Sequence, residues 1–155
     1  MTNWGMGRPA LAALFLGLAA PAQAADVLQV ATKDGDPLVA MRFDGAEICL
    51  TWAHSVTGGA VADCFAAQDE RLILVRSYLH DYAAGLGDVA GRGRVVPAAR
   101  GGYWIVGIDE TLPPNGLPLR VGPARVGHKL TGAAGVIDLS ALAANSLVTL
   151  RVRPE

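Results

Sequence analysis

This 155-residue sequence has few of the residues that usually carry chemistry. It contains two cysteines, three histidines, and three each of Trp, Tyr and Phe, and only 17% of its residues are charged. Basic and acidic residues nearly balance, with a net charge of −1 at pH 7. Such a chain lacks the strongly basic patch that nucleic-acid binding requires. After the first two dozen residues, no segment is long and apolar enough to cross a bilayer, which takes about 20 residues.

The N-terminal residues have the three zones of a signal peptide. Arg8 gives a positive start, residues 10–20 form an uncharged apolar run, and Ala22-Gln23-Ala24 supplies the small-x-small pattern of a cleavage site. The run is too short for a membrane span, and no cysteine follows it to carry a lipid. We expect residues 1–24 to be a signal peptide and the protein to be periplasmic; an uncleaved anchor is the alternative.

Cleavage there leaves residues 25–155, the size of one domain and enough to bury a core. Arg8 is the one basic residue that precedes the cut, and all 14 acidic residues follow it, so the mature net charge is −2. We expect a single β-rich domain that holds no cofactor.

The two cysteines, Cys49 and Cys64, leave the question of a disulfide open. An oxidising compartment permits one, and both residues stand on strands expected to be hairpin neighbours. A two-residue turn at Gly58-Gly59 would pair Cys64 with Ala53 and leave Cys49 too far away. A turn one or two residues earlier would bring the sulfurs together; otherwise they are two small buried thiols.

Short apolar runs with period-two alternation, separated by Gly, Pro and Asp, predict an all-β fold. About nine short strands at this spacing predict an antiparallel sandwich or a partly open barrel. The strand candidates are 27–32, 38–43, 47–56, 60–67, 71–77, 103–108, 118–121, 126–130, 136–139 and 146–153, with a helical turn at 140–145. The stretch 78–102 breaks the alternation and predicts a long excursion, and such loops are usually functional or mobile.

The segment from Leu50 to Phe65 holds the most distinctive candidates for a site. By parity His54 lies on the apolar face beside Trp52, where it needs a hydrogen-bond partner, and Asp63 is the expected partner. Ser55 points to the other face, so His54 and Ser55 cannot form a nucleophile–base pair. His54 is therefore either a binding residue or a satisfied structural residue of the hairpin.

A second group of candidates follows the strand at 71–77. Its glycines allow positive φ and can turn backbone N–H groups toward an anion such as a carboxylate. The alternative is a tight turn without a ligand. The binding candidates of this group are Ser77, His80, Ala84, Gly85, Leu86 and Gly87.

Two catalytic hypotheses have less support. Zinc could be bound by His54, His80 and His128 with Asp63 or Asp81. No local spacing such as H-x-x-x-H joins these histidines. A serine hydrolase would use Ser55 or Ser77, but the chain has no G-x-S-x-G elbow.

Several segments together resemble the family known as domain of unknown function 1850. They are Trp52-x-His54-Ser55-Val56, Asp63-Cys64-Phe65, Ser77, Ala84-Gly85-Leu86, Tyr103-Trp104-Ile105 and Pro118-Leu-Arg-Val-Gly122. The resemblance runs from about Phe43 to the C-terminus. In many relatives the small-residue turn reads Gly-Ala-Gly, and Ala83 stands here in place of the first glycine.

The family has no established activity, but its members are often encoded beside TAXI-type TRAP transporters. The resemblance therefore implies a periplasmic accessory or binding module rather than an enzyme. Its partners would be a TRAP permease or a TAXI solute-binding protein. The polar face of His54, Asp63, His80 and the Gly85–Gly87 loop is expected to contact such a partner or a small carboxylated solute. The alternative function is a metal-assisted periplasmic hydrolase that uses the histidines.

Overall fold

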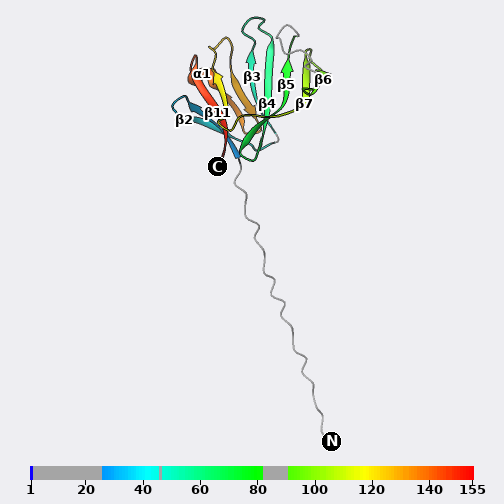
Figure 1. Cartoon of the computed structure of the whole chain (residues 1–155), viewed down its shortest axis with the longest axis vertical. Helices are drawn as coiled ribbons and strands as arrows, with labels where there is room; N and C mark the ends of the chain where they lie inside the picture. Colours follow the sequence, from blue (N-terminus) through cyan, green and yellow to red (C-terminus); the bar gives the residue numbers. More distant parts are fainter. Residues whose placement is uncertain (2–25, 46, 82–90) are drawn as a thin grey trace.

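The computed structural model describes residue 1 and residues 26–45, 47–81 and 91–155 (Figure 1). The expected signal peptide, apart from Met1, and the turn from Ala84 to Gly87 lie outside these residues. None of the described helical segments is long and apolar enough to cross a membrane.

The described residues form two antiparallel sheets. The first has the strand order β2-β1-β11-β8, formed by Pro37–Arg42, Asp26–Thr32, Leu147–Pro154 and Leu117–Arg120. The second has the order β10-β9-β3-β4-β5-β7-β6, formed by Gly135–Asp138, Lys129–Gly132, Ile48–Ala53, Ala60–Gln68, Arg71–Leu79, Tyr103–Thr111 and Arg94–Pro97. The predicted all-β class is confirmed, with eleven strands in the described residues where about nine were expected.

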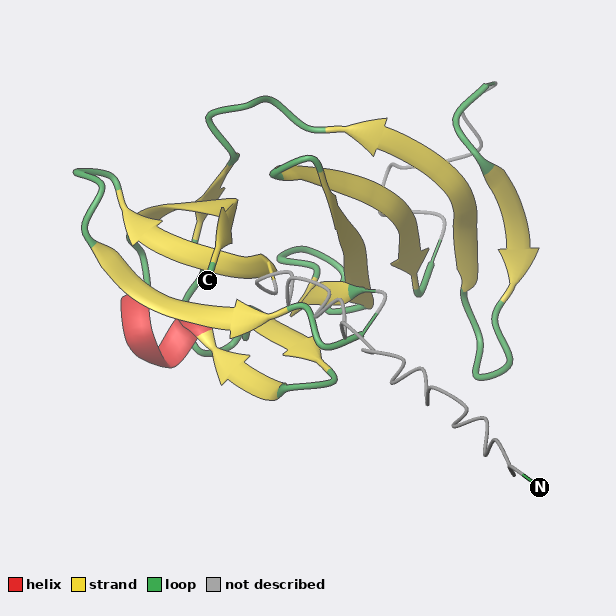
Figure 2. Ribbon diagram, turned by 90° about the horizontal axis from the view of Figure 1, so that it is seen from below, coloured by secondary structure: helices red, strands yellow, loops and turns green. Residues whose placement is uncertain are grey.

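The two sheets curve round one shared interior, as seen from below in Figure 2. On β11, Val148, Leu150 and Val152 are 1%, 0% and 4% exposed, so the alternation predicted for the last strand is confirmed. The second sheet contributes Leu50 and Phe65 to the same core. Burying an aliphatic or aromatic side chain of this size stabilises the fold by roughly 1.5–3 kcal/mol.

A disulfide joins the central hairpin of the second sheet. Cys49 on β3 lies directly opposite Cys64 on β4, their Cα atoms are 3.9 Å apart, and their sulfurs are bonded. Ala53 pairs with Ala60, so the turn is centred two residues before Gly58-Gly59. Of the two registers that the sequence allowed, this is the one that brings the sulfurs together. A bridge across such a short loop stabilises by about 3 kcal/mol in the chain-entropy model.

Two of the differences from the sequence prediction lie in the stretches 78–102 and 126–130. Strand β6 lies inside the stretch 78–102 and pairs with β7, so part of the expected excursion belongs to the sheet. The strand expected at 126–130 begins instead at Lys129. The reason is a turn, because the N–H groups of Val126 and Gly127 both donate to the carbonyl of Pro123.

The helical turn expected near residue 140 is the short helix α1, Leu139–Ala143. Asp138 caps it, since its side chain accepts a hydrogen bond from the N–H of Ala141. This cap places Ser140 at the start of the helix, where it faces the connection between β8 and β9.

Candidate functional site

A cavity of about 560 Å³ is lined by residues at the ends of β3 and β8. Strand β3 ends on the side of the described fold away from the C-terminus (Figure 1). We call this cavity the arginine cavity. Its walls come from the end of β3 and the β3–β4 turn, from the end of β8 and the connection between β8 and β9, and from Asn145 in the loop between α1 and β11. The lining residues are Trp52, His54, Ser55, Arg120, Val121, Gly122, Pro123, Arg125, Val126, His128 and Asn145.

A stacked pair of rings forms one wall of the arginine cavity. The rings of Trp52 and His128 have centroids 5.8 Å apart and planes 24° from parallel. Nδ1 of His128 accepts the N–H of Gly122 at 2.9 Å, so the neutral ring carries its proton on Nε2. Burial lowers the pKa of His128 below its ordinary value of 6.5. The ring is therefore a neutral N–H donor at pH 7.

The connection between β8 and β9 is held in place from both sides. The hydroxyl of Ser140 donates to the carbonyl of Gly122 at 2.8 Å and accepts the N–H of His128 at 2.9 Å. At Gly122 there is no room for a side chain, because a Cβ would lie 2.7 Å from Cβ of Val126. Glycine at this position lets the segment fold back tightly and sets the shape of the cavity wall.

His54 organises the turn that forms the opposite rim. Its Nδ1 lies 3.4 Å and 3.3 Å from the backbone N–H groups of Val56 and Thr57, which donate to it. Its own N–H donates to the carbonyl of Gly59, and its carbonyl accepts the N–H of Gly58, both at 2.8 Å. The expected pairing of His54 with Asp63 is thus wrong, since backbone amides take the place of the carboxylate. Because Nδ1 accepts, Nε2 is the protonated nitrogen of the neutral ring.

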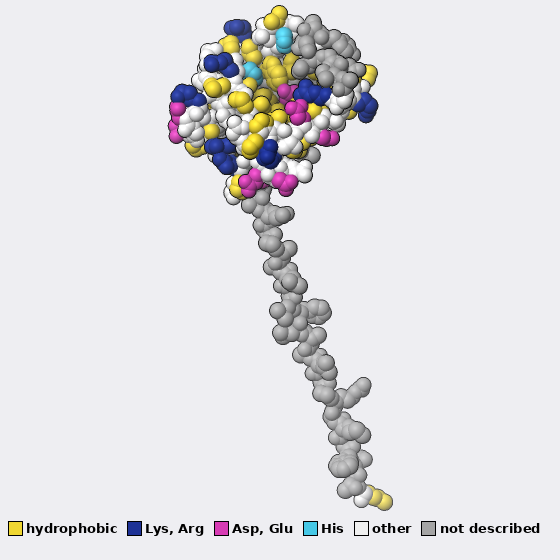
Figure 3. Space-filling view, in the orientation of Figure 1, with side chains coloured by type: hydrophobic (Ala, Val, Ile, Leu, Met, Phe, Trp, Pro, Cys, Tyr) yellow, Lys and Arg dark blue, Asp and Glu magenta, His cyan; other side chains and the backbone are white. Residues whose placement is uncertain are grey.

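The charge of the arginine cavity is positive. Arg120 donates to the backbone carbonyl of Asn145 at 3.2 Å, while Arg125 is exposed and has no ion-pair partner among the described residues. The described lining residues include no carboxylate to offset the two guanidinium groups. Elsewhere on the visible face, basic and acidic side chains are interspersed (Figure 3). Two arginines and two histidine N–H donors suit an anion, and arginine in particular suits a carboxylate.

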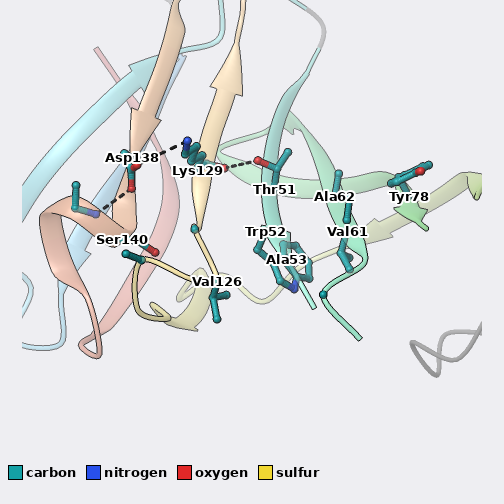
Figure 4. Close-up of a pocket in the computed structure, with 15 residues that line it drawn as sticks. Thr51, Trp52, Ala53, Val61, Ala62, Tyr78, Val126, Lys129, Asp138 and Ser140 are labelled. Carbon is teal, nitrogen blue, oxygen red and sulfur yellow. Dashed lines mark hydrogen bonds and ion pairs between the residues drawn. The ribbon is translucent and has the colours of Figure 1, made fainter. Parts of the chain in front are cut away.

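A second cavity of about 570 Å³ adjoins the first, and Trp52 and Val126 line both. We call it the alanine cavity, because Ala53, Ala60, Ala62, Ala124 and Ala141 line it. Figure 4 shows it between β3 and β4 on one side and β9 and α1 on the other, with Val126 at its base. Its described charged residues, Lys129 and Asp138, pair with each other at 3.8 Å.

Asp63 and Ser77 form a separate polar pair in the interior. They lie directly opposite each other on β4 and β5, and the Ser77 hydroxyl donates to Oδ1 of Asp63 at 2.6 Å. Burial raises the pKa of Asp63 above its ordinary value of 3.8, while the Ser77 hydrogen bond and the positive charge of Arg92 partly lower it. Neither residue lines the arginine cavity or the alanine cavity.

Of the remaining predicted residues, His80 does not line the arginine cavity. His80 is exposed just past β5, with its Nδ1 3.5 Å from the hydroxyl of Tyr78. Ala84, Gly85, Leu86 and Gly87 lie outside the described residues. The predicted set is therefore divided: His54 and Ser55 share the arginine cavity, and Asp63 and Ser77 form the interior pair.

The histidines do not assemble a metal site within the described part of the chain. The one group there with ligand atoms within 4.8 Å of one another is Glu47, Cys49 and Cys64. Its two cysteines are bonded to each other and have no thiolate to offer. Ser77 donates its hydrogen to Asp63 and Ser55 stands on an exposed turn, so neither has a histidine base as a recorded partner.

The family model of a domain of unknown function, DUF1850, matches residues 48–139. The chain belongs to the DUF1850 family. The match covers every strand of the second sheet and all residues of the arginine cavity except Asn145. No curated protein and no solved structure gives a significant match.

Sequence reasoning found one rim of the arginine cavity and missed the other. Arg120 lies within Pro118-Leu-Arg-Val-Gly122, a segment that carries the resemblance to DUF1850, but its alternation in a short strand does not mark it as a site residue. Arg125 gave no local signal. Pairing the two resembling segments, around His54 and around Arg120, would have located the cavity, because the fold brings them together.

Proposed function

We propose that this DUF1850 protein is a periplasmic binding module, not an enzyme, that holds a carboxylated solute in the arginine cavity and acts beside a TAXI-type TRAP transporter. One observation carries the proposal. Two segments far apart in the sequence, Trp52–Val56 and Pro118–Gly122, converge on a single cavity that contains two arginines and no described carboxylate.

The chemistry of the lining favours binding over catalysis. Both histidines use Nδ1 to accept backbone N–H groups, so each is committed to holding a turn and offers an N–H donor to a ligand. In the described part of the chain, neither ring is hydrogen-bonded to a hydroxyl or a thiol, as a general base would be. A binding site for a carboxylate needs hydrogen-bond donors held in fixed positions, and the lining of the arginine cavity supplies them.

The transporter role rests on the resemblance and on the expected export. Members of the family are often encoded beside TAXI-type TRAP systems, and such systems carry solutes that a periplasmic protein must first bind. A small exported module with its own anion cavity fits that setting, either passing solute to the solute-binding protein or sensing its presence.

The test measures carboxylate binding by calorimetry on the mature protein, with acetate, butyrate and hexanoate as probes. Arg125→Gln should weaken binding by about tenfold or more, because it removes a charged hydrogen-bond donor. Arg153→Gln is the matched control, since Arg153 is exposed on β11 and lies outside the cavity. No binding of any carboxylate, or equal losses in the two variants, would refute the proposed ligand.

The transporter association has its own test. The tagged mature protein should co-purify with the TAXI solute-binding protein or the TRAP permease after mild crosslinking of native cells. Recovery without either component would refute the association and leave the carboxylate result to stand by itself.

A further inference from the structure

A third cavity, of about 550 Å³, lies on the outer face of the second sheet, on the side away from the core. We call it the aromatic cavity, because the rings of Tyr78 and Trp104 line it. Its walls come from strands β3, β4, β5, β7 and β9 and from residues 98–101 in the turn between β6 and β7. It has no described lining residue in common with the arginine cavity.

The strand register forms the floor of the aromatic cavity. Leu50 on β3 points into the core, so its neighbour Thr51 points to the opposite face of the sheet. Thr51 lies opposite Ala62, which lies opposite Tyr78, and Figure 4 shows these three side by side in this order. Tyr78 in turn lies opposite Trp104, which completes a row across four strands. Because Ala62 carries only a methyl group, the row is hollowed between Thr51 and Tyr78.

The rings of Tyr78 and Trp104 are held in fixed positions. Their centroids are 5.2 Å apart and their planes are tilted by 54°. The Tyr78 hydroxyl donates to the carbonyl of Gly101 at 2.9 Å, which ties its ring to the turn. The guanidinium of Arg76 lies 4.5 Å from the centre of the Trp104 ring and binds Glu47 through Nε and Nη2, both at 2.7 Å. Rings fixed in this way lose little conformational entropy when a ligand packs against them.

Arg100 is the charged group among the described lining residues of the aromatic cavity. It is exposed in the turn and has no ion-pair partner in the described part of the chain. The carboxylate of Glu47 lies within 4.8 Å of the Cys49 sulfur, which lines the cavity, but Glu47 is already paired with Arg76. The positive charge of Arg100 is therefore available to an anionic group on a ligand.

We infer that the aromatic cavity is a second binding site, for a planar aromatic carboxylate. The ring of the ligand lies over Ala62 against Tyr78 and Trp104, where aromatic contacts add to the burial of apolar surface. Its carboxylate pairs with Arg100, whose planar guanidinium matches a carboxylate. The volume is within the usual range for a small-molecule site. This inference goes beyond the proposed function and does not depend on it.

The first experiment is an NMR titration of the unmutated, isotope-labelled mature protein with benzoate, cyclohexanecarboxylate and benzamide. Benzoate should shift the amide signals of Thr51, Ala62 and Gly101. Affinity measured from these signals should be about fivefold lower for cyclohexanecarboxylate, which lacks the aromatic ring. It should be about threefold lower for benzamide, which lacks the charge.

Two results would overturn the inference. One is benzoate binding that leaves the signals of Thr51, Ala62 and Gly101 unmoved, and the other is equal affinity for the three compounds at this site. The amide signals of His54 and Gly122 report the arginine cavity in the same titration. The proposed function and the second site are therefore tested separately.

The second experiment tests the role of Arg100. Arg100→Gln should lower the affinity of the aromatic cavity for benzoate to that for benzamide, and should leave benzamide binding unchanged. Arg94→Gln is the matched control, because Arg94 is exposed on β6 and does not line the cavity. Unchanged benzoate binding in Arg100→Gln, or an equal loss in Arg94→Gln, would overturn the inference. The titration of the unmutated protein decides the question even if a variant fails to fold.

Discussion

At the scale of single residues, Asp63 places a carboxyl group beside the apolar core. It lies opposite Leu50 in the register of β3 and β4, so it shares the core-facing side of the sheet. Among the described residues, the hydroxyl of Ser77 is the hydrogen-bond donor to its side chain. A carboxylate with a single neutral donor is poorly compensated for its lost hydration, and burial accordingly raises the pKa of Asp63.

The raised pKa makes stability depend on pH in a defined direction. Between the ordinary value of 3.8 and the higher native pKa, the folded state holds a proton that the unfolded state releases. The free energy of unfolding therefore falls as pH rises through this window. Asp63→Asn does not titrate and can still accept from Ser77. We expect its stability advantage over the unmutated protein to grow with pH through the window and then level off, as measured by urea unfolding at a series of pH values.

A second variant tests whether the pH dependence comes from Asp63 and its hydrogen bond with Ser77. Ser77→Ala removes the hydrogen bond that lowers the pKa of Asp63, so the window should extend to higher pH. Parallel stability curves for Asp63→Asn and the unmutated protein would mean that Asp63 titrates as it does in the unfolded chain.

Sequence pattern could place single residues on faces but could not assign their partners. Alternation put His54 on the side of Leu50 and Trp52 and suggested Asp63 as its partner. The strand ends at Ala53, however, and His54 begins a turn whose backbone amides donate to its ring. The hydrogen-bond partner of His54 depends on the residue at which the strand ends, and the alternation of side chains along the strand does not specify that residue.

At the scale of elements, the β3–β4 turn is held mainly by its first residue. His54 binds the turn with its side chain, its N–H and its carbonyl, and the N–H of Gly59 donates to the Thr57 hydroxyl at 3.2 Å. The side chain of Val56 is 85% exposed at the tip. The turn therefore owes its shape to these hydrogen bonds and not to packing.

Replacing His54 should loosen the turn without unfolding the domain. In His54→Ala, the amides of Val56 and Thr57 lose their acceptor, and we expect their exchange with water to quicken by about fivefold, the effect of losing roughly 1 kcal/mol. In His54→Asn, the side-chain oxygen can accept the same amides in an Asx turn, so slow exchange should return. NMR exchange rates measure both. Fast exchange in both variants, or no change in His54→Ala, would contradict this role.

The elements themselves were largely predictable, and their registers were not. Period-two alternation identified the strands of both sheets, because a half-buried strand must alternate. The choice between two hairpin registers depended on a turn whose length no local residue fixes, and the disulfide depended on that register. Strand β6 was missed because Arg94–Pro97 pairs on one side only and its sequence shows little alternation.

At the scale of the whole molecule, the N-terminal strand is structurally indispensable. Strand β1 begins at Asp26 and lies between β2 and β11, pairing with both. Every residue from Asp26 to Thr32 has a partner on β11. Strand β2 has no other neighbour in the described sheet, so losing β1 would detach it. Whatever removes the N-terminal segment must therefore cut before Asp26.

Cleavage after Ala24 meets this requirement and gives the last prediction. It leaves Ala25 ahead of β1, so the first sheet stays whole. The intact mass of protein recovered from the periplasm should match residues 25–155, and it should be two hydrogens lighter than the dithiol form because an oxidising compartment closes Cys49 to Cys64. A mass that includes residues 1–24 would contradict cleavage, and a free dithiol in the recovered protein would contradict the Cys49–Cys64 bridge. Ala24→Arg places a large charged side chain at the cleavage site and should prevent cleavage. The intact mass of this variant should therefore still include residues 1–24, which would show that cleavage depends on Ala24.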